Sequence, residues 1–297
     1  MKQKVKAILL IIVSSVMAAA ILCSCSLDFL FDSVGEKQYD GKLAVHFLDV
    51  GQGDSIFIEL PNDQTMLIDA GENYHGEGII NYIKKAGHSK IDYLVATHPH
   101  SDHIGSLPYI VRNYEIGTVY MPKVSATSKL YESLLKSVKS KKLSVKNGKA
   151  GVNIVKIDDL SVDIIAPSKI DESNLNNCSI VIMLKFGNNS FLLTGDAETG
   201  EMKTVKADLN AQVLKAGHHG SKNSTTKSLL KKINPEITII SCGKNNEYGH
   251  PDKEVLTLLK NIKSSVYRTD KDKTIVIVSD GKNLTVSTNN QSIKRAS

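Results

Sequence analysis

The feature that most constrains this chain is a dense group of ligand-type side chains directly after an apolar segment. That segment, residues 93–96, predicts a buried strand that ends at Thr97. Within the next six positions the chain offers three imidazoles and one carboxylate: His98, His100, Asp102 and His103. Because a regular strand or helix cannot turn all four toward one ion, we expect a loop that curls around metal. The first two histidines would bind one ion, and the Asp102–His103 pair would turn toward a second.

Several motifs together resemble a known group of enzymes. Thr97–His103 resembles the signature of the metallo-β-lactamase superfamily. Four further stretches are similar to the hydrolase domain of ComEC-type competence proteins, which act in DNA uptake: residues 46–55, 192–198, 214–221 and 240–251. The resemblance covers roughly residues 43–286 and implies a four-layer αββα sandwich with metals in the cleft where two sheets meet. The residue pattern alone, with strands and helices that alternate along much of the chain, predicts only an α/β fold.

The resemblance also implies the rest of a metal centre with two divalent ions, zinc or manganese. Asp196, which ends an apolar strand, would bridge the ions, because a shared anion offsets the repulsion between two cations. His218 fits the remaining ligand position of the second ion, and His250 is its rival. Otherwise His250 would donate a proton or hold the substrate. Asp69 would orient a metal ligand without binding the metal itself. The alternative is that Asp69 is an ordinary turn residue at the end of a strand.

Other residues near these motifs are candidates for substrate contact. His219, Ser221 and Lys222 follow the same strand as His218 and could hold a phosphate group, or they could be solvated loop residues. Asp102 is expected to act in catalysis as well as in metal binding. His46, His75 and His88 are expected to be structural or surface histidines.

The chain departs from the superfamily pattern at one ligand of the first ion. Many dinuclear members supply a third histidine there, but this chain has no histidine between His103 and His218. Asn176 or Asn177 stands where that ligand would fall. The change weakens the case for a tight tetrahedral zinc ion and favours manganese or partial occupancy.

The activity that the resemblance implies is metal-assisted hydrolysis. Bound metal lowers the pKa of water from 15.7 toward about 7, and the resulting hydroxide attacks phosphorus or carbonyl carbon without a side-chain nucleophile. We expect a phosphodiesterase or nuclease that acts on extracellular DNA, with DNA-uptake channel proteins as partners. The first alternative is a phosphodiesterase on cell-envelope polymers, similar to teichoic-acid phosphorylcholine esterases, and a β-lactamase ranks below it. The non-enzymatic alternative is a binding module with a degenerate metal site.

The N-terminus has the pattern of a bacterial lipoprotein signal. Lys2, Lys4 and Lys6 precede an apolar run, and the run leads into Leu22-Cys-Ser-Cys25, which resembles a lipobox. We therefore expect a signal peptide over residues 1–24, lipidation of Cys25, a tether over residues 25–41 and a hydrolase domain over residues 42–297. This places the domain on the extracytoplasmic face of the cell membrane, held by a lipid anchor. An uncleaved signal anchor is the alternative.

Net charge and aromatic content limit how the protein could bind a nucleic acid or another polyanion. The formal net charge is +6, and loss of the three leader lysines would reduce it to about +3, which suits a polyanionic substrate only mildly. The absence of Trp and an aromatic content of 5% argue against a stacking platform for single-stranded nucleic acid. A helix with a basic outer face is predicted over residues 129–139. The two remaining cysteines, Cys178 and Cys242, are expected to be separately buried, although one disulfide between them is the alternative.

Overall fold

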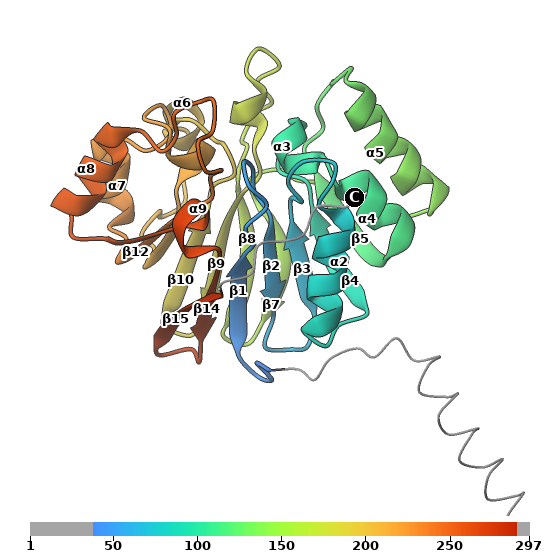
Figure 1. Ribbon diagram of the computed structural model, residues 1–297, viewed down its shortest axis with the longest axis horizontal. Coiled ribbons are helices and arrows are strands. Elements are labelled where there is room, and N and C mark those ends of the chain that lie inside the picture. Colours follow the sequence, from blue (N-terminus) through green and yellow to red (C-terminus); the bar gives the residue numbers. More distant parts are fainter. Residues whose placement is uncertain (1–37, 290–297) are drawn as a thin grey trace, which may run out of the picture.

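Two β-sheets pack face to face, and helices cover the outer face of each (Figure 1). The computed structural model describes residues 38–289. The signal peptide, Cys25 and most of the tether therefore lie outside the described residues. The two sheets and their helices form the four layers expected of an αββα sandwich, so the predicted fold class is confirmed.

The first sheet has eight strands. Its first three strands along the chain form an antiparallel meander, and the next three continue from it in parallel. The order across the sheet is β15 (Leu284–Asn289), β14 (Thr274–Ser279), β1 (Leu43–Phe47), β2 (Ile56–Glu59), β3 (Thr65–Ile68), β4 (Lys90–Val95), β5 (Glu115–Met121) and β6 (Ser144–Asn147).

The second sheet has seven strands. Its strands are antiparallel from β7 to β10 and parallel from β10 to β13. The order across the sheet is β13 (Ser265–Arg268), β12 (Ile237–Ile240), β11 (Val213–Lys215), β10 (Asn189–Leu193), β9 (Val181–Phe186), β8 (Leu160–Ala166) and β7 (Val152–Ile157).

Three apolar clusters hold the layers together. One lies between the sheets, a second joins the first sheet to its helices, and a third joins the second sheet to its helices. The first sheet carries α2 (Gly76–Lys85), α3 (Ser101–Ile104), α4 (Leu107–Asn113) and α5 (Lys129–Ser140). The second carries α6 (Thr199–Met202), α7 (Lys227–Ile233) and α8 (Lys253–Asn261), and α9 (Thr269–Asp272) precedes β14. Short 3-10 turns are η1 (Leu175–Cys178) and η2 (Gly217–Gly220).

Two local expectations are wrong in detail. The segment after His100 is not a plain loop, because Ser101–Ile104 forms the helical turn α3. The residue pattern after Asp196 also predicts a helix near residues 198–206, but α6 ends at Met202. Cys178 and Cys242 are both buried and free, as expected.

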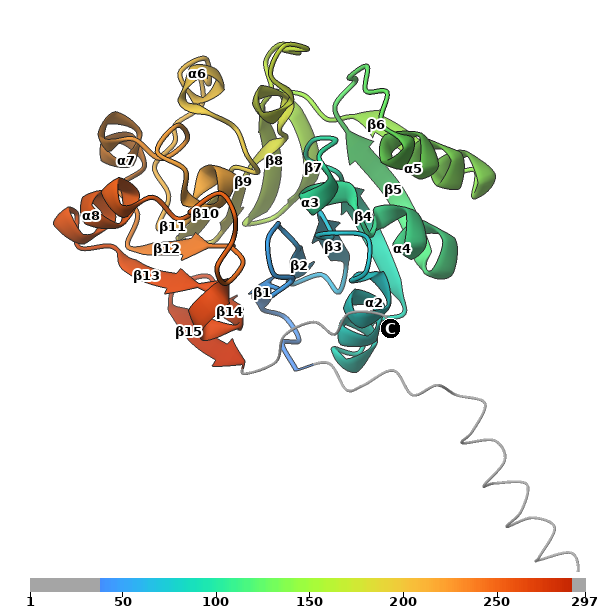
Figure 2. The ribbon, with the colours of Figure 1, turned by 45° about the horizontal axis from the view of Figure 1, so that its top comes forward.

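The parallel strands position the functional loops. Strands β3 to β6 run in one direction, so the residues that follow each of them lie at one edge of the first sheet. The residues that follow β10, β11 and β12 share an edge of the second sheet in the same way. Figure 2 shows α3 at the end of the sandwich where the two edges meet. Within residues 38–289, no helix combines the length and apolarity needed to cross a bilayer.

Candidate metal centre

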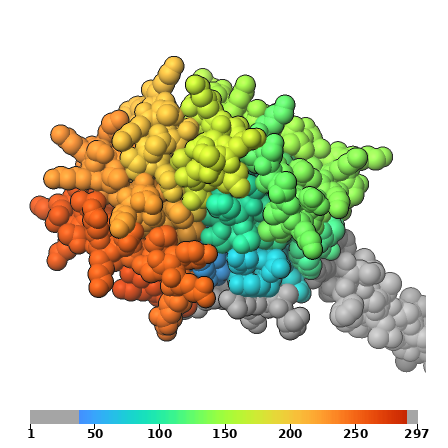
Figure 3. Space-filling view, turned by 90° about the horizontal axis from the view of Figure 1, so that it is seen from above, coloured from blue at the N-terminus to red at the C-terminus, as the bar shows by residue number. Residues whose placement is uncertain are grey.

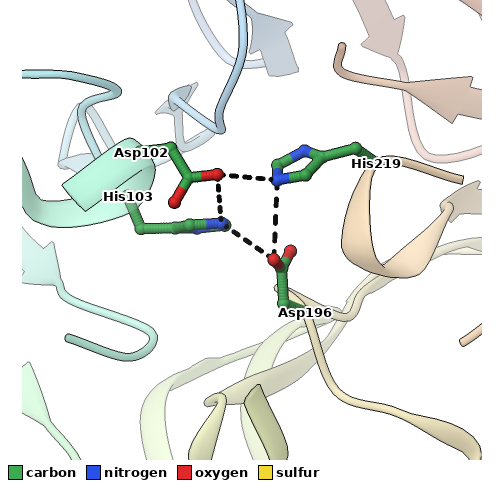
Figure 4. A group of neighbouring side chains, drawn as sticks. All are labelled: Asp102, His103, Asp196 and His219. Atoms are coloured by element: carbon green, nitrogen blue, oxygen red, sulfur yellow. Dashed lines mark hydrogen bonds and ion pairs between the residues drawn. The ribbon is translucent and has the colours of Figure 1, made fainter. Parts of the chain in front are cut away.

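Four side chains from the two sheets point at one another across the cleft (Figure 4). Asp102 and His103 come from α3, Asp196 follows β10, and His219 follows β11. Nε2 of His103 lies 3.2 Å from Oδ2 of Asp196, which lies 3.5 Å from Nε2 of His219. Nε2 of His219 is 3.1 Å from Oδ2 of Asp102. Ligands about 2.1 Å from one tetrahedral ion lie about 3.4 Å apart, so this spacing fits a divalent cation.

Asp69 fixes the orientation of His103. Its Oδ2 accepts a hydrogen bond of 2.8 Å from Nδ1 of His103. Thr97 donates to the same carboxylate from its backbone nitrogen at 2.8 Å and from its hydroxyl at 2.5 Å. This hydrogen bond places a proton on Nδ1 of His103, so the lone pair of Nε2 faces Asp196. Two acceptors that face each other repel unless a cation or a proton lies between them.

His219 is held in the matching orientation on the other side. Its Nδ1 donates to the carbonyl oxygen of Ser241 at 2.9 Å, which leaves the lone pair of Nε2 toward Asp102. The carboxylate of Asp54 lies 3.4 Å from the same Nδ1. The ring is buried, so both contacts act away from bulk water.

A buried ion pair braces this side of the centre. Nζ of Lys215, at the end of β11, is 2.6 Å from Oδ2 of Asp54, and both side chains are buried. The backbone nitrogen of Asp54 also donates to the carbonyl oxygen of Asp102 at 3.1 Å. Gly53 is required beside it, because an added Cβ would meet that carbonyl oxygen. The pair therefore links the two sheets behind the metal-ligand cluster. The sequence signal for this ion pair is a lysine that ends an apolar strand.

The pKa values of the cluster residues also indicate that the cluster needs positive charge. Burial lowers the pKa of His103, but the carboxylates of Asp196 and Asp102 outweigh it and hold that pKa well above its ordinary value. For His219 burial is again outweighed, chiefly by Asp196, and the pKa rises to about 10. Burial raises the pKa of Asp196, but the histidines lower it well below its usual range. A divalent ion satisfies the same carboxylates without these protons.

His98 and His100 form a second, looser group beside the first. Nε2 of His98 lies 3.0 Å from Nδ1 of His100 and 4.0 Å from Oδ2 of Asp196. Burial lowers the pKa of both histidines, which keeps their nitrogens available as ligands. Ser179 holds the group, since its hydroxyl is 3.3 Å from Nδ1 of His98 and accepts a hydrogen bond from the backbone nitrogen of Asp196.

The two adjacent histidines after β11 differ from the expected assignment. The structure brings His219, not His218, into the four-residue cluster. His218 is partly exposed, and its Nε2 is 3.9 Å from Oδ2 of Asp196. Both residues have positive φ, 50° and 54°, so the chain turns sharply and aims the two rings apart.

A cavity of about 320 Å³ opens over the cluster. Asn176, His218 and His250 lie on its wall together with Gln52 and Tyr248. Asn176 is buried, and its side-chain oxygen has no hydrogen-bond partner among the described residues. The neighbouring Asn177 instead accepts a hydrogen bond from the backbone nitrogen of Glu198.

Two predicted substrate contacts lie away from this cavity. Ser221 is buried, and its hydroxyl oxygen accepts a hydrogen bond from the backbone nitrogen of Asn223. The side chain of Lys222 is exposed, and its backbone nitrogen donates to Asp252 at 2.8 Å. Neither residue is on the wall of the cavity. The geometry therefore gives them no direct contact with a group bound at the cluster.

Residues 48–244 match the metallo-beta-lactamase superfamily. The chain belongs to this superfamily. The match spans more than half of the sequence and contains every residue of the four-ligand cluster. Members of the superfamily are metal-dependent hydrolases, so the prediction of an enzyme of this class is confirmed.

Individual relatives narrow the likeness. The chain is 32% identical over 282 residues to ComE operon protein 3 of Bacillus subtilis (strain 168), covering 88% of this chain and 36% of that protein. It is 28% identical to Recombination protein 2 of Haemophilus influenzae, covering 84% of this chain and 30% of the relative. The chain thus spans about a third of the length of these two relatives.

Solved structures show the same fold. The metallo-beta-lactamase fold protein YhfI from Bacillus subtilis superposes with a TM-score of 0.53 at 11% identity, covering 80% of this chain and all of the other. At that identity the likeness concerns the fold alone. The expected similarity to metallo-β-lactamase-fold competence proteins is confirmed by the family match and the sequence relatives.

Proposed function

We propose that this protein is a metal-dependent phosphodiesterase that acts on extracellular DNA. The observation that carries the proposal is the cluster of Asp102, His103, Asp196 and His219, in which two imidazole lone pairs and two carboxylates face one point. The substrate class comes from the relatives, among which is Competence protein ComA of Neisseria gonorrhoeae. Zinc or manganese, bound as two ions, is part of the proposal.

The two proposed metal ions would have different sets of ligands, one close together and one more widely spaced. Asp102, His103, Asp196 and His219 would hold one ion. His98 and His100 would hold the other with a shared oxygen of Asp196, because His98 also approaches that carboxylate. When bound, the metals would supply a Lewis acid and an activated water.

The remaining roles belong to side chains around the cavity. Asp102 touches both His219 and the open space, so it would orient the attacking group as well as bind metal. His250 lies across the cavity, with its ring centre 5.4 Å from that of His218. From there His250 would give a proton to the leaving oxygen, and His218 would hold the substrate rather than metal.

A substrate panel tests the proposal. Purified protein, loaded with manganese or zinc, is offered single-stranded DNA, double-stranded DNA, bis-p-nitrophenyl phosphate and a choline phosphodiester. We expect hydrolysis of DNA and of the small diester. Asp196→Asn should lower the rate a thousandfold or more, because the substitution removes the negative charge shared by the ligand sets and each tenfold of rate is 1.36 kcal/mol.

Two outcomes of this panel would contradict the proposal. Hydrolysis of the choline diester with every DNA form left intact would replace DNA by an envelope polymer as the substrate. Normal activity of Asp196→Asn, with an unchanged circular dichroism spectrum, would show that hydrolysis does not need the Asp196 carboxylate and that the catalytic centre lies elsewhere.

We also propose that Cys25 is acylated and tethers the domain to the outer face of the cell membrane, where DNA-uptake channel proteins would be its partners. The lipobox-like Leu22-Cys-Ser-Cys25 supports the anchor, and the competence relatives support the partners. Metabolic labelling with a radioactive fatty acid should mark the wild type and leave Cys25→Ala unlabelled. Label that persists in the variant would refute the anchor.

A further inference from the structure

One side of the cleft is bordered by an unusually basic segment. Residues 122–150 contain eight lysines, all exposed, and a single acidic residue, Glu132. Glu132 approaches Lys136, with a distance of 3.9 Å between the charged atoms. The segment after β12 on the other side differs, because residues 244–252 contain one lysine and two acidic residues. Of these two segments, only the one on the side formed by β5, α5 and β6 carries net positive charge.

Strand direction decides which of these lysines lie near the metal centre. The carboxyl ends of β4, β5 and β6 share one edge, and β4 leads directly into the metal ligands. Lys123 follows β5, Lys129 begins α5, and Lys149 follows β6, so all three lie at that edge. In Figure 3, viewed from this end, the green surface of the segment lies beside the teal surface around α3.

These three ammonium groups are available for an external anion. Lys123, Lys129 and Lys149 are exposed, and none of them forms an ion pair with another described residue. Lys146 is different, because its Nζ lies 5.6 Å from the centre of the Tyr120 ring. The remaining lysines of α5 lie further along the helix, toward the opposite edge.

The cluster itself cannot attract a long polyanion. It presents the carboxylates of Asp102 and Asp196, which two divalent ions would only offset locally. Phosphates on either side of the reacting one need separate positive charge, and unpaired lysines beside the cavity supply it. None of the three lysines is on the cavity wall, so a small diester bound at the cluster would not depend on them.

We propose that Lys123, Lys129 and Lys149 form a lysine rim that binds the flanking phosphates of a polymeric polyanion while one phosphodiester lies at the metal centre. The proposal rests on the phosphodiesterase function above and adds to it the path of the polymer, which leaves the cleft over the β5–α5–β6 side.

The test compares two triple variants with the same change in charge. The first, Lys123→Gln, Lys129→Gln and Lys149→Gln, removes the rim. The second removes three exposed lysines at the opposite edge: Lys42, Lys141 and Lys231, each changed to Gln. Both keep all residues of the metal centre. Circular dichroism and metal content establish that each variant is folded and loaded.

We expect the rim variant to bind single-stranded DNA at least tenfold more weakly at low salt. The slope of log affinity against log salt should fall by about 2, since each lost phosphate contact contributes about 0.7. The kcat/KM for bis-p-nitrophenyl phosphate should stay unchanged. The opposite-edge variant should match the wild type in both measurements. The rim proposal would be overturned if both variants lost DNA affinity equally. It would also be overturned if the rim variant lost as much kcat/KM for bis-p-nitrophenyl phosphate as it lost DNA affinity.

A separate binding experiment distinguishes an error in the lysine-rim proposal from an error in the proposed DNA phosphodiesterase function. Wild-type and variant proteins are titrated with a fluorescent oligonucleotide and with inorganic polyphosphate. If the wild type cleaves no DNA but only the rim variant loses polyphosphate binding, the rim stands and the DNA phosphodiesterase fails. If the rim variant binds both polymers as tightly as the wild type, the rim is refuted whatever the substrate.

Discussion

Among single residues, Asn176 stands where many superfamily members place a third histidine on the first ion. Its side-chain oxygen is buried, lacks a hydrogen-bond partner among the described residues and belongs to a residue on the cavity wall. The turn that carries Asn176 is fixed to the centre, because its carbonyl oxygen accepts from the backbone nitrogen of Ser179, which contacts His98. An amide oxygen is a harder ligand than imidazole and suits manganese better than zinc.

We predict that Asn176→His will raise zinc affinity relative to manganese by about tenfold or more, because imidazole nitrogen suits zinc. Asn176→Ala should weaken manganese binding at the first position. Competition titration with a chromophoric chelator, together with the manganese electron paramagnetic resonance signal, measures both. The matched control is Asn177→Ala, whose side chain bonds to the backbone of Glu198. If all three variants bind both metals like the wild type, Asn176 is not a ligand.

The sequence identified most of the residues at the centre, but it could not assign two neighbours to their roles. His98, His100, Asp102, His103 and Asp196 do gather at one cleft. His218 and His219 exchange places because both adopt positive φ, a conformation that L-residues other than glycine seldom take and that no local pattern signals. The long-range pair of Lys215 and Asp54 was equally hidden, since 161 positions of sequence separate its partners.

Among the helices, hydrophobic periodicity predicted those that bury one apolar face. Apolar spacing predicts helices over residues 77–86 and 129–139, and α2 and α5 occur there, with buried residues that recur on one face of each. The helix after Asp196 fails as a prediction, since α6 stops after four residues with only two of them buried. The spacing of the ligand-type residues at α3 predicts a loop and gives no sign of a helical turn. In the structure they also form helical backbone hydrogen bonds, such as that from Gly105 to Ser101.

Strand order is the element-scale fact that the sequence could not supply. The strands β10 to β13 are parallel neighbours in chain order, whereas β14 crosses back to pair with β1 of the other sheet. These pairings are set by packing between distant segments, and local propensity carries no information about them. The shared edge that gathers the metal ligands, and with it the lysine rim, follows from this order.

For the whole molecule, a buried group away from the metal centre links folding to pH. Glu59 on β2 contacts two buried histidines. It accepts a hydrogen bond of 2.7 Å from Nε2 of His88, and Nε2 of His46 lies 3.0 Å from its other carboxylate oxygen. Burial raises the pKa of Glu59, but the interactions with His46 and His88 outweigh it and hold the value at about 2, against an ordinary 4.5. The folded state therefore favours the charged carboxylate more than the unfolded state does.

The sign of the effect follows from this lowered pKa. The stabilisation by Glu59 is fully present above about pH 4.5 and is lost as the pH falls toward 2. We predict that Glu59→Gln lowers the free energy of unfolding on the order of 2 kcal/mol near neutral pH, because it removes a charged acceptor from two buried imidazoles. The difference between wild type and variant should shrink steadily below pH 4.5. Urea unfolding followed by circular dichroism from pH 6 to pH 2 measures it, with the exposed Glu132→Gln as a control that should show a near-zero difference at every pH. A Glu59→Gln difference that stays constant over the whole range would show that the two histidines do not hold this carboxylate in its charged form.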